Sequence, residues 1–338
     1  MRISEEKKAA VRFYLLEKIM QGEKSLSKTV AEAFDMNQAT IHTYLNELVE
    51  QAVITRTGRG KYELVQNEEH FLLTRAAGQL DSDMYAYEEF LLPRIRHLPQ
   101  NVRDIWCYAF SEMMNNVMDH SEAEQVDLCI RRSYLDTSVI IEDNGVGIFE
   151  KIRSHFRLDS LEDAICELFK GKLTTDAVHH SGEGIFFSSK LMDAFLIFSG
   201  GKVFSRDRYD REQLAELEGE GPGTTVYMKL SNFSQKLSRD VFDLYTNEDN
   251  QFTKTSVPLK MMFDASPVSR SQAKRVYNRF EEFREIILDF DGLDWMGQGF
   301  AHQIFAVYQK EHPELEIIPI NMSDGVRSMY LHVLEKQG

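Results

Sequence analysis

Two short stretches decide the fold of the central part of the chain: EMMNNVMDH at residues 112–120 and EDNGVGI at residues 142–148. In the first stretch Glu112, Asn116 and His120 recur every four residues, so a helix places them on one face. The amide oxygen of Asn116 suits Mg²⁺, a hard ion that prefers oxygen ligands. The carboxylate of Glu112 suits a base that orients or deprotonates an attacking hydroxyl or water. Taken alone, this pattern is more typical of a solvated polar stripe on an ordinary helix.

The second stretch places a carboxylate at the end of a predicted strand. Strands are expected over residues 126–131 and 137–142, because apolar residues alternate or run together there. Asp143 follows the second strand and is itself followed by Gly145 and Gly147. A buried carboxylate beside an open glycine backbone is a suitable acceptor for the exocyclic amine of adenine.

Two further glycine-containing stretches extend this pattern. The run HSGEGI at residues 180–185 opens a predicted helix that continues to about Asp193. Gly182 and Gly184 would expose backbone N–H groups there to a phosphate, with the helix dipole assisting. The run GPGTTVYM at residues 221–228 turns into a strand, where Thr224 or Thr225 could offer a hydroxyl to the base or to a bridging water.

In this order the motifs E-x-x-x-N, D-x-G-x-G, G-x-G and G-T-x-V resemble the GHKL ATPases over about residues 85–232. That superfamily includes histidine kinase catalytic domains, anti-sigma-factor serine kinases, gyrase-type ATPases and Hsp90. The resemblance implies a Bergerat-type α/β sandwich that binds ATP with Mg²⁺. The roles it implies are the catalytic carboxylate for Glu112, the Mg²⁺ ligand for Asn116, the adenine acceptor for Asp143 with its turn shaped by Gly145 and Gly147, the phosphate loop for Gly182 and Gly184, and the adenine-side hydroxyl for Thr224 or Thr225.

The same motifs favour one branch of the superfamily over another. The compact helix at 112–120 and the HSGEG run resemble the anti-sigma kinases more than the sensor kinases. A sensor kinase needs a phosphoacceptor histidine on a long helical hairpin, and neither His70 nor His97 has such a context. Lys170 and Lys172 precede the second glycine motif, and we interpret both as solvated charges rather than as ligands of the γ-phosphate.

The first 66 residues are predicted to form a separate domain. Helices are expected over 4–20, 27–34 and 38–51, followed by two short strands at 53–55 and 61–64. This order resembles a winged helix-turn-helix, whose third helix lies in the major groove of DNA. The alternative is a protein-interaction or dimerisation module of the same fold. The candidate DNA-binding residues are Gln38, Thr40, His42, Thr43 and Asn46 on the helix, and Arg56, Arg59 and Lys61 in the wing.

Charge and cysteine usage limit the possible partners. The 338 residues carry a formal net charge of −15, so the chain lacks a whole-protein basic footprint for nucleic acid. Residues 1–65 contain ten Lys and Arg against nine Asp and Glu, so any DNA contact must be local. The three cysteines show no metal or disulfide spacing, and no apolar run approaches the ~20 residues of a membrane span. A cytoplasmic protein without a membrane partner is expected.

The last part of the chain, residues 236–338, is predicted to be a linker and a small α/β domain. Strands and helices alternate there, and the run LDFDGLDWM at 288–296 resembles STAS-like domains related to anti-sigma-factor antagonists. The phosphoacceptor position of antagonists corresponds to Gly297, Gln298 and Gly299, none of which has a hydroxyl. A docking or self-association module is therefore favoured over a phosphorylated one.

The sequence thus predicts a multidomain α+β protein with a winged helix at 1–66, a Bergerat-fold ATP-binding domain with an N-terminal connector at 67–235, and a STAS-like domain. Its expected function is that of a cytoplasmic, nucleotide-controlled transcriptional or partner-switching regulator. Two alternatives remain open: a serine/threonine kinase of the anti-sigma-factor type that acts on a separate partner, and a slow ATP-driven dimerising clamp.

Overall fold

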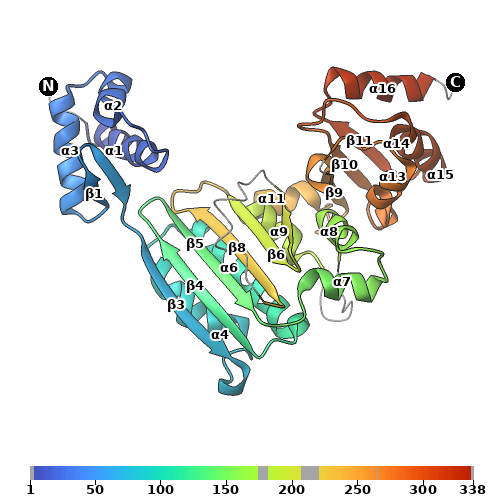
Figure 1. The fold of residues 1–338 in the computed structure, drawn as a ribbon, viewed down its shortest axis with the longest axis horizontal. Coiled ribbons are helices and arrows are strands. Elements are labelled where there is room, and N and C mark those ends of the chain that lie inside the picture. Colours follow the sequence, from blue (N-terminus) through green and yellow to red (C-terminus); the bar gives the residue numbers. More distant parts are fainter. Residues whose placement is uncertain (1–3, 174–181, 207–220, 264, 336–338) are drawn as a thin grey trace. The chain divides into compact units, whose positions relative to one another are not determined.

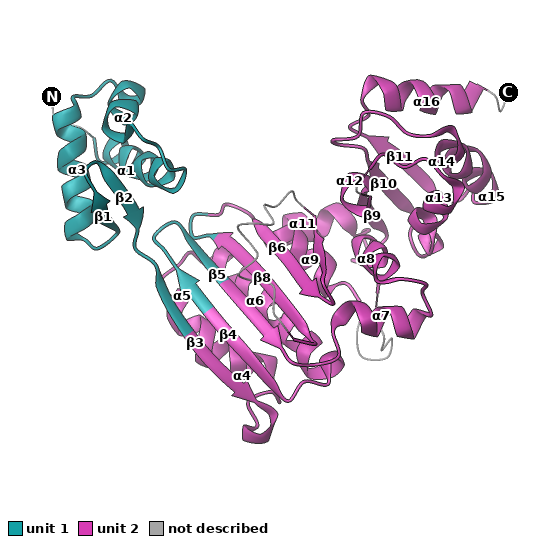
Figure 2. Cartoon of the chain, in the orientation of Figure 1, with its two compact units in different colours: residues 1–69, 130–138, 231–233 teal, residues 70–129, 139–230, 234–338 magenta. Residues whose placement is uncertain are grey.

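A computed structural model describes residues 4–173, 182–206, 221–263 and 265–335 (Figure 1). His180 and Ser181 of the HSGEG run lie outside these residues. The chain divides into two compact units (Figure 2): residues 1–69 with 130–138 and 231–233, and residues 70–129 with 139–230 and 234–338. Within the described residues, no helix has the length and hydropathy needed to cross a membrane.

The first unit contains the three helices and the hairpin expected of a winged helix. Ser4 caps the first helix by accepting from Lys7 N at 3.2 Å, and Asn37 caps the third by accepting from Ala39 N at 2.8 Å. The second helix begins at Leu26, one residue before the expected Ser27, because Leu26 is buried in the core. The elements are α1 Glu5–Met20, α2 Leu26–Phe34, α3 Gln38–Glu50, and the antiparallel strands β1 Ile54–Gly58 and β2 Lys61–Leu64.

The core of this unit extends beyond the first 66 residues. Val11, Leu15, Ile41 and Leu45 of the helices are buried together with Leu135, which belongs to the hairpin between the fourth and fifth strands. The rings of Phe13 and Phe233 meet edge to face at a centroid distance of 5.3 Å. The unit is therefore completed by two segments that follow it far along the chain.

A six-stranded sheet forms the scaffold of the ATP-binding domain, with helices α6 and α9 covering one face (Figure 1). The side of α6 that is buried carries residues such as Trp106, Phe110 and Met114. In spatial order the strands are β3 Asn67–Thr74, β4 Gln125–Arg132, β5 Asp136–Asp143, β8 Thr224–Ser231, β6 Ala194–Ser199 and β7 Lys202–Ser205, and the helices are α6 Gln100–Asn116, α7 Ile148–Phe156, α8 Leu161–Lys170 and α9 Gly184–Leu191.

The predicted connector at 67–100 contains more structure than a linker. Its first part is the edge strand β3, which the sequence analysis did not predict. Glu68 and Glu69 on this strand pair with Arg131 and Arg132 of β4, at 2.7 Å in both cases. The rest of the connector forms α4 Asp83–Ala86, a π-helical turn Tyr87–Leu91 and α5 Leu92–Ile95.

The C-terminal domain is a parallel three-stranded sheet in the order β11-β10-β9 with helices around it. The first strand of this sheet ends at Pro258, after which the chain turns into a short helix. The helix that begins at Arg270 ends at Tyr277, because Asn278 leaves the helical conformation with ψ of 128°, and Arg279 then has a φ of 62°. The elements are α11 Ser238–Tyr245, β9 Lys254–Pro258, α12 Leu259–Met262, α13 Arg270–Tyr277, β10 Glu285–Asp289, α14 Gln298–His302, a π-helical turn Gln303–Tyr308, α15 Gln309–Glu311, β11 Glu316–Ile320 and α16 Asp324–Glu335.

One hydrophobic core joins the C-terminal domain to the ATP-binding domain within the second unit. Phe186 and Phe187 of α9 belong to the same buried cluster as Phe252, Val257 and Ile286. The ring centroids of Phe186 and Phe252 are 4.7 Å apart. The two domains are thus packed against each other through shared buried side chains.

Candidate functional site

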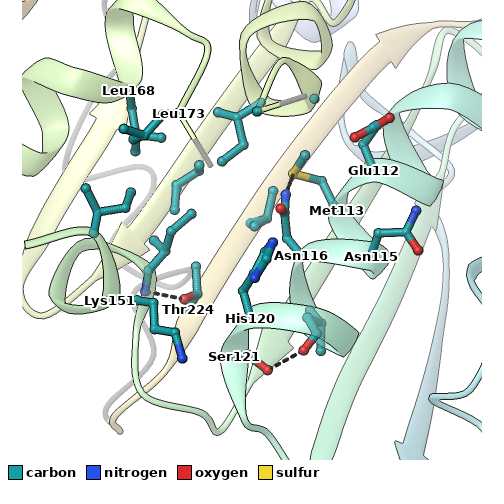
Figure 3. A pocket seen from close by; sticks show the side chains of 18 of the residues that line it. Glu112, Met113, Asn115, Asn116, His120, Ser121, Lys151, Leu168, Leu173 and Thr224 are labelled. Carbon is teal, nitrogen blue, oxygen red and sulfur yellow. Dashed lines mark hydrogen bonds between the residues drawn. The ribbon is translucent and has the colours of Figure 1, made fainter. Parts of the chain in front are cut away.

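A cavity of about 370 Å³ opens between α6 and the segments that follow β5 and α8. Figure 3 shows Glu112, Asn116 and His120 on one side of the cavity and Lys151, Leu168 and Leu173 on the other. The helical spacing that the sequence suggested is preserved, although the helix widens into a π-helical turn over Val117–Ser121. The structure therefore directs three polar side chains of one helix face into one cavity.

Asp143 lies at the end of β5 and is only 5% exposed. Its Oδ1 accepts a hydrogen bond from Gly145 N at 2.8 Å. Burial raises the pKa of Asp143 above its usual value, while hydrogen bonds from Gly145 and Thr224 act in the opposite direction. A buried carboxyl group at the wall of a cavity is the acceptor that the amine of a purine requires.

The glycines after Asp143 are required by close backbone contacts. A Cβ on Gly145 would lie 2.0 Å from the carbonyl oxygen of Ser121, which is a backbone atom that cannot move aside. Gly147 has a φ of 81°, and a Cβ there would lie 2.7 Å from Ser199 Oγ. Gly147 also lines the cavity, so this turn brings the backbone close to any bound ligand.

Gly182 and Gly184 both line the cavity next to the N-terminus of α9. The carbonyl of Gly182 accepts a hydrogen bond from Leu173 N at 3.0 Å, which fixes its backbone. A Cβ on Gly184 would lie 2.0 Å from Glu112 Oε2, so the carboxylate of Glu112 rests directly on this backbone. The candidate base and the candidate phosphate loop are therefore in contact.

The two candidate threonines have different positions. Thr224 lines the cavity, and its Oγ1 accepts a hydrogen bond from Ile148 N at 3.0 Å. Thr225 is buried and is not among the described residues that line the cavity. The geometry therefore favours Thr224 as the hydroxyl on the side of the base.

Asn116 fits the role of an Mg²⁺ ligand by its chemistry and position. Its amide nitrogen lies 3.9 Å from the sulfur of Met113, which leaves the amide oxygen for a metal. An amide oxygen is the hard ligand that Mg²⁺ prefers. Because Asn116 stands one helical turn from Glu112, a metal held there would lie beside the candidate base.

Lys170 and Lys172, which the sequence suggested to be solvated charges, both bind groups of the protein. Lys170 is fully buried, and its Nζ pairs with Glu167 Oε1 at 2.8 Å. Lys172 donates from Nζ to the carbonyl of Glu282 at 2.6 Å. Neither is among the described residues that line the cavity. The prediction of a solvated charge is wrong for Lys170, because both its charge and its donors are satisfied inside the protein.

Several residues of the cavity were not singled out from the sequence. Lys151 lines it and forms an ion pair with Glu122. Ile148 and Ile152 contribute an apolar wall from α7. Ile148 ends the DNGVGI run and Ile152 follows four residues later, and this spacing was the available signal, since it places both on one helix face.

The candidate DNA-binding residues lie on the surface of the first unit. On α3, Gln38, His42, Thr43 and Asn46 are exposed, whereas Thr40 is partly buried. Thr43 Oγ1 donates to the carbonyl of Ala39 at 3.2 Å. In the wing, the three basic residues Arg56, Arg59 and Lys61 are exposed, and Arg56 Nη2 donates to Tyr62 Oη at 2.9 Å.

The absence of a hydroxyl-bearing residue at position 297 of the C-terminal domain has a steric reason. Gly297 immediately precedes α14, and a Cβ there would lie 2.6 Å from the backbone of Val268. A serine at this position would need the backbone to move. That Gly297, Gln298 and Gly299 do not form a phosphoacceptor stays a prediction from the sequence.

Comparison with protein families agrees with this geometry. Residues 102–232 match the family of histidine kinase-, DNA gyrase B- and HSP90-like ATPases, and residues 272–327 match a STAS-like domain of unknown function. A comparison with curated proteins finds no match. The central domain is an ATPase domain of the GHKL type. With the STAS-like domain that follows it, the chain is an ATP-binding regulatory protein.

Proposed function

We propose that the protein is a nucleotide-controlled regulator in which a Mg-ATP site governs DNA binding or partner exchange by the flanking domains. The observation that carries the proposal is the meeting of Glu112, Asn116 and Asp143 in one cavity. A regulator of this kind requires contacts that differ between ATP and ADP, since a ligand shifts an equilibrium only by its differential affinity. Contacts near the γ-phosphate are the natural source of that difference.

Each residue of the site has a role that its position supports. Asp143 accepts from the base, Thr224 assists it, and Ile148 packs beside it. Gly182 and Gly184 present backbone at the N-terminus of α9, where a phosphate is stabilised. Bound Mg-ATP would supply the phosphoryl group. Its γ-phosphate would supply the contacts that ADP lacks.

DNA binding by the first unit is part of the proposal. Its support is the row of exposed polar side chains on α3 together with the exposed basic residues of the wing. Footprinting with ATP, with ADP and without nucleotide tests it. Protection of DNA that changes with the nucleotide supports the proposal, and absence of protection in every state contradicts the DNA part.

Kinase activity on a separate partner is a second candidate function. The observation in its favour is the contact between the carboxylate of Glu112 and the backbone of Gly184, because it places a base next to the predicted phosphates. Transfer of radiolabelled phosphate from ATP to a serine or threonine of a lysate protein, lost in Glu112→Ala, would identify it.

The central test is binding and hydrolysis of Mg-ATP by the wild type, Asp143→Asn and Glu112→Ala. We expect Asp143→Asn to weaken binding by about 10- to 100-fold, because the amide presents a donor where the base requires an acceptor. Glu112→Ala should bind nucleotide with little or no turnover. Glu142→Gln is the control, since its carboxylate is exposed one residue away. Wild-type protein that binds no ATP would overturn the proposed site.

A further inference from the structure

The STAS-like domain is connected to the wall of the nucleotide cavity by a buried polar network. The wall segment, residues 167–173, comprises the end of α8 and the three residues after it, and Leu168, Gly171 and Leu173 of this segment line the cavity. Glu167, Lys170 and Lys172 of the segment are not among the described residues that line the cavity, and they bind residues of the C-terminal domain.

Lys170 forms the first part of this network. Its Nζ donates to the carbonyl oxygens of Arg275 and Asn278 at 2.9 and 2.8 Å, and to Glu167 Oε1 at 2.8 Å. Its own carbonyl accepts from Thr255 Oγ1 of β9 at 2.6 Å. A fully buried ammonium group with three acceptors is held in one position, because any displacement leaves a buried charge without partners.

Arg279 forms the second part of the network and contacts α7, α8 and the residues after α8. It follows α13, and its Nη1 pairs with Glu167 Oε2 at 3.2 Å while its Nη2 donates to the carbonyl of Lys172. Glu282 accepts from Nε and Nη2, both at 2.7 Å, so the guanidinium plane is fixed. The guanidinium also lies over the ring of Phe156 in α7, 5.4 Å from its centroid.

The packing around Gly171 also connects the wall segment to the C-terminal domain. A Cβ on Gly171 would lie 2.8 Å from the ring of Phe252, which belongs to the core shared with the C-terminal domain. The wall segment is therefore bound on its outer side by polar contacts and by an aromatic ring, and on its inner side it forms the cavity.

We propose that Arg279 is a positioning residue for the nucleotide site: through it, the docked STAS-like domain holds the wall segment in the position that binds nucleotide. This inference rests on the proposed Mg-ATP site. Binding of ATP and docking of the STAS-like domain are then coupled, and the coupling is reciprocal by thermodynamic linkage. A partner that displaces the STAS-like domain weakens ATP binding, and ATP strengthens the docking.

The test compares Arg279→Gln with Arg275→Gln in the full chain, with binding of Mg-ATP measured by calorimetry at a temperature where both are folded. Arg275 is the matched control, because its side chain also reaches from α13 to α8 but pairs there with Asp163, at 2.9 Å, which lies outside the wall segment. We expect Arg279→Gln to bind about tenfold more weakly and Arg275→Gln to stay within about twofold. Arg279→Lys should recover part of the affinity, because it keeps the charge.

A folded Arg279→Gln that binds Mg-ATP as tightly as the wild type would overturn the inference. If that variant does not fold, Glu282→Gln replaces it, since this change removes the carboxylate that fixes the guanidinium plane while the backbone of Glu282 still binds Lys172. Weaker binding supports the positioning role, and unchanged binding contradicts it.

Hydrogen exchange without nucleotide separates this inference from the proposed function. The amide of Leu173, which donates to Gly182, should exchange faster in Arg279→Gln than in the wild type, while the amides of β4 and β5 stay unchanged. Unchanged exchange at Leu173 would contradict the positioning role even if ATP binding by the wild type is confirmed. Faster exchange in a protein whose wild type binds no ATP would show that Arg279 holds the wall segment and that it is the proposed Mg-ATP site that fails.

Discussion

At the scale of single residues, the site combines groups that tolerate change with groups that do not. Gly145 and Gly184 both lack room for a Cβ, but the atoms that a Cβ would meet are different. At Gly145 the obstacle is a backbone carbonyl, and at Gly184 it is the end of the flexible Glu112 side chain. The same substitution should therefore affect folding at one position and chemistry at the other.

We expect Gly145→Ala to lower the free energy of unfolding by at least about 2 kcal/mol, because the overpacked backbone must shift. Gly184→Ala should change it by less than about 1 kcal/mol, since alanine favours the helix that begins there. Its turnover of ATP should nevertheless fall by roughly 100-fold, because Glu112 is displaced. Urea unfolding and an ATPase assay measure the two effects, and equal loss of stability in both variants would contradict the prediction.

The buried Asp143 predicts a pH-dependent difference in stability. Burial raises its pKa in the folded state above the usual 3.8, so the folded protein holds this proton more tightly than the unfolded chain does. The stability contributed by the group is present below the usual pKa and is lost as the pH rises through the raised value. Asp143→Asn has no such loss, although it should bind ATP poorly.

Relative to the wild type, Asp143→Asn should therefore gain stability as the pH rises above about 4 in the absence of nucleotide. Urea unfolding of both proteins across this range measures the difference. Glu142→Gln, whose carboxylate is exposed, should show no comparable trend. A difference that stays constant, or that decreases with pH, would contradict the assigned direction of the Asp143 pKa.

At the scale of elements, the end of β8 is fastened to the hairpin between β4 and β5 by one amide. Asn232 is 7% exposed, and its Nδ2 donates to the carbonyls of Ser133 and Tyr134 at 3.1 and 3.2 Å. Its Oδ1 accepts from Thr137 Oγ1 at 2.8 Å. All four hydrogen-bonding residues belong to the first unit, so this contact helps to complete the unit.

We expect Asn232→Ala to reduce the free energy of unfolding by about 1–3 kcal/mol, because it leaves buried polar groups unsatisfied. Asn46→Ala is the control in the same unit, since Asn46 is exposed on α3 and its loss should stay within about 0.5 kcal/mol. Chemical denaturation measures the free energy of unfolding of the two variants. Similar losses in both would show that the Asn232 contacts contribute little to stability.

Element by element, the sequence predicted what depends on local signals. The helix α6, the strand β5 and the turn after Asp143 were expected because their motifs are continuous in the chain. The edge strand β3 was missed because its contacts are not local: Glu68 and Glu69 bind Arg131 and Arg132, about 60 residues away. Lys170 was misjudged for the same reason: two of its three acceptors, the carbonyls of Arg275 and Asn278, come from a different domain. Lys151 lacked a motif of its own.

At the scale of the whole molecule, domain boundaries in the chain and in space do not coincide. The winged helix was assigned to residues 1–66, yet its core includes Leu135, which is 5% exposed. Removing the first 66 residues from the chain would therefore expose Leu135, which packs against their buried side chains. The boundary drawn from the sequence is therefore too simple, since the unit also takes in 130–138 and 231–233.

Leu135→Ala should destabilise the N-terminal helices by about 2–4 kcal/mol, although it lies far from them in sequence. Hydrogen exchange should show faster exchange in α1 and α3 of this variant. Leu72→Ala is the matched control, because Leu72 is 60% exposed. Unchanged protection of α1 and α3 in Leu135→Ala would mean that the helices do not depend on the hairpin.

The strand β8 begins at Thr224 in the cavity and ends at Ser231, the first of the residues 231–233 that complete the first unit. Eight residues of strand cover roughly 26 Å at about 3.3 Å each. Side chains alternate between the two faces, so the loss or gain of one residue would reverse all those beyond it. Evolution can then vary the loops on either side freely, but an insertion or deletion within β8 would disturb the nucleotide end and the N-terminal end together. Relatives of this protein should preserve the length of this strand even where its sequence has diverged.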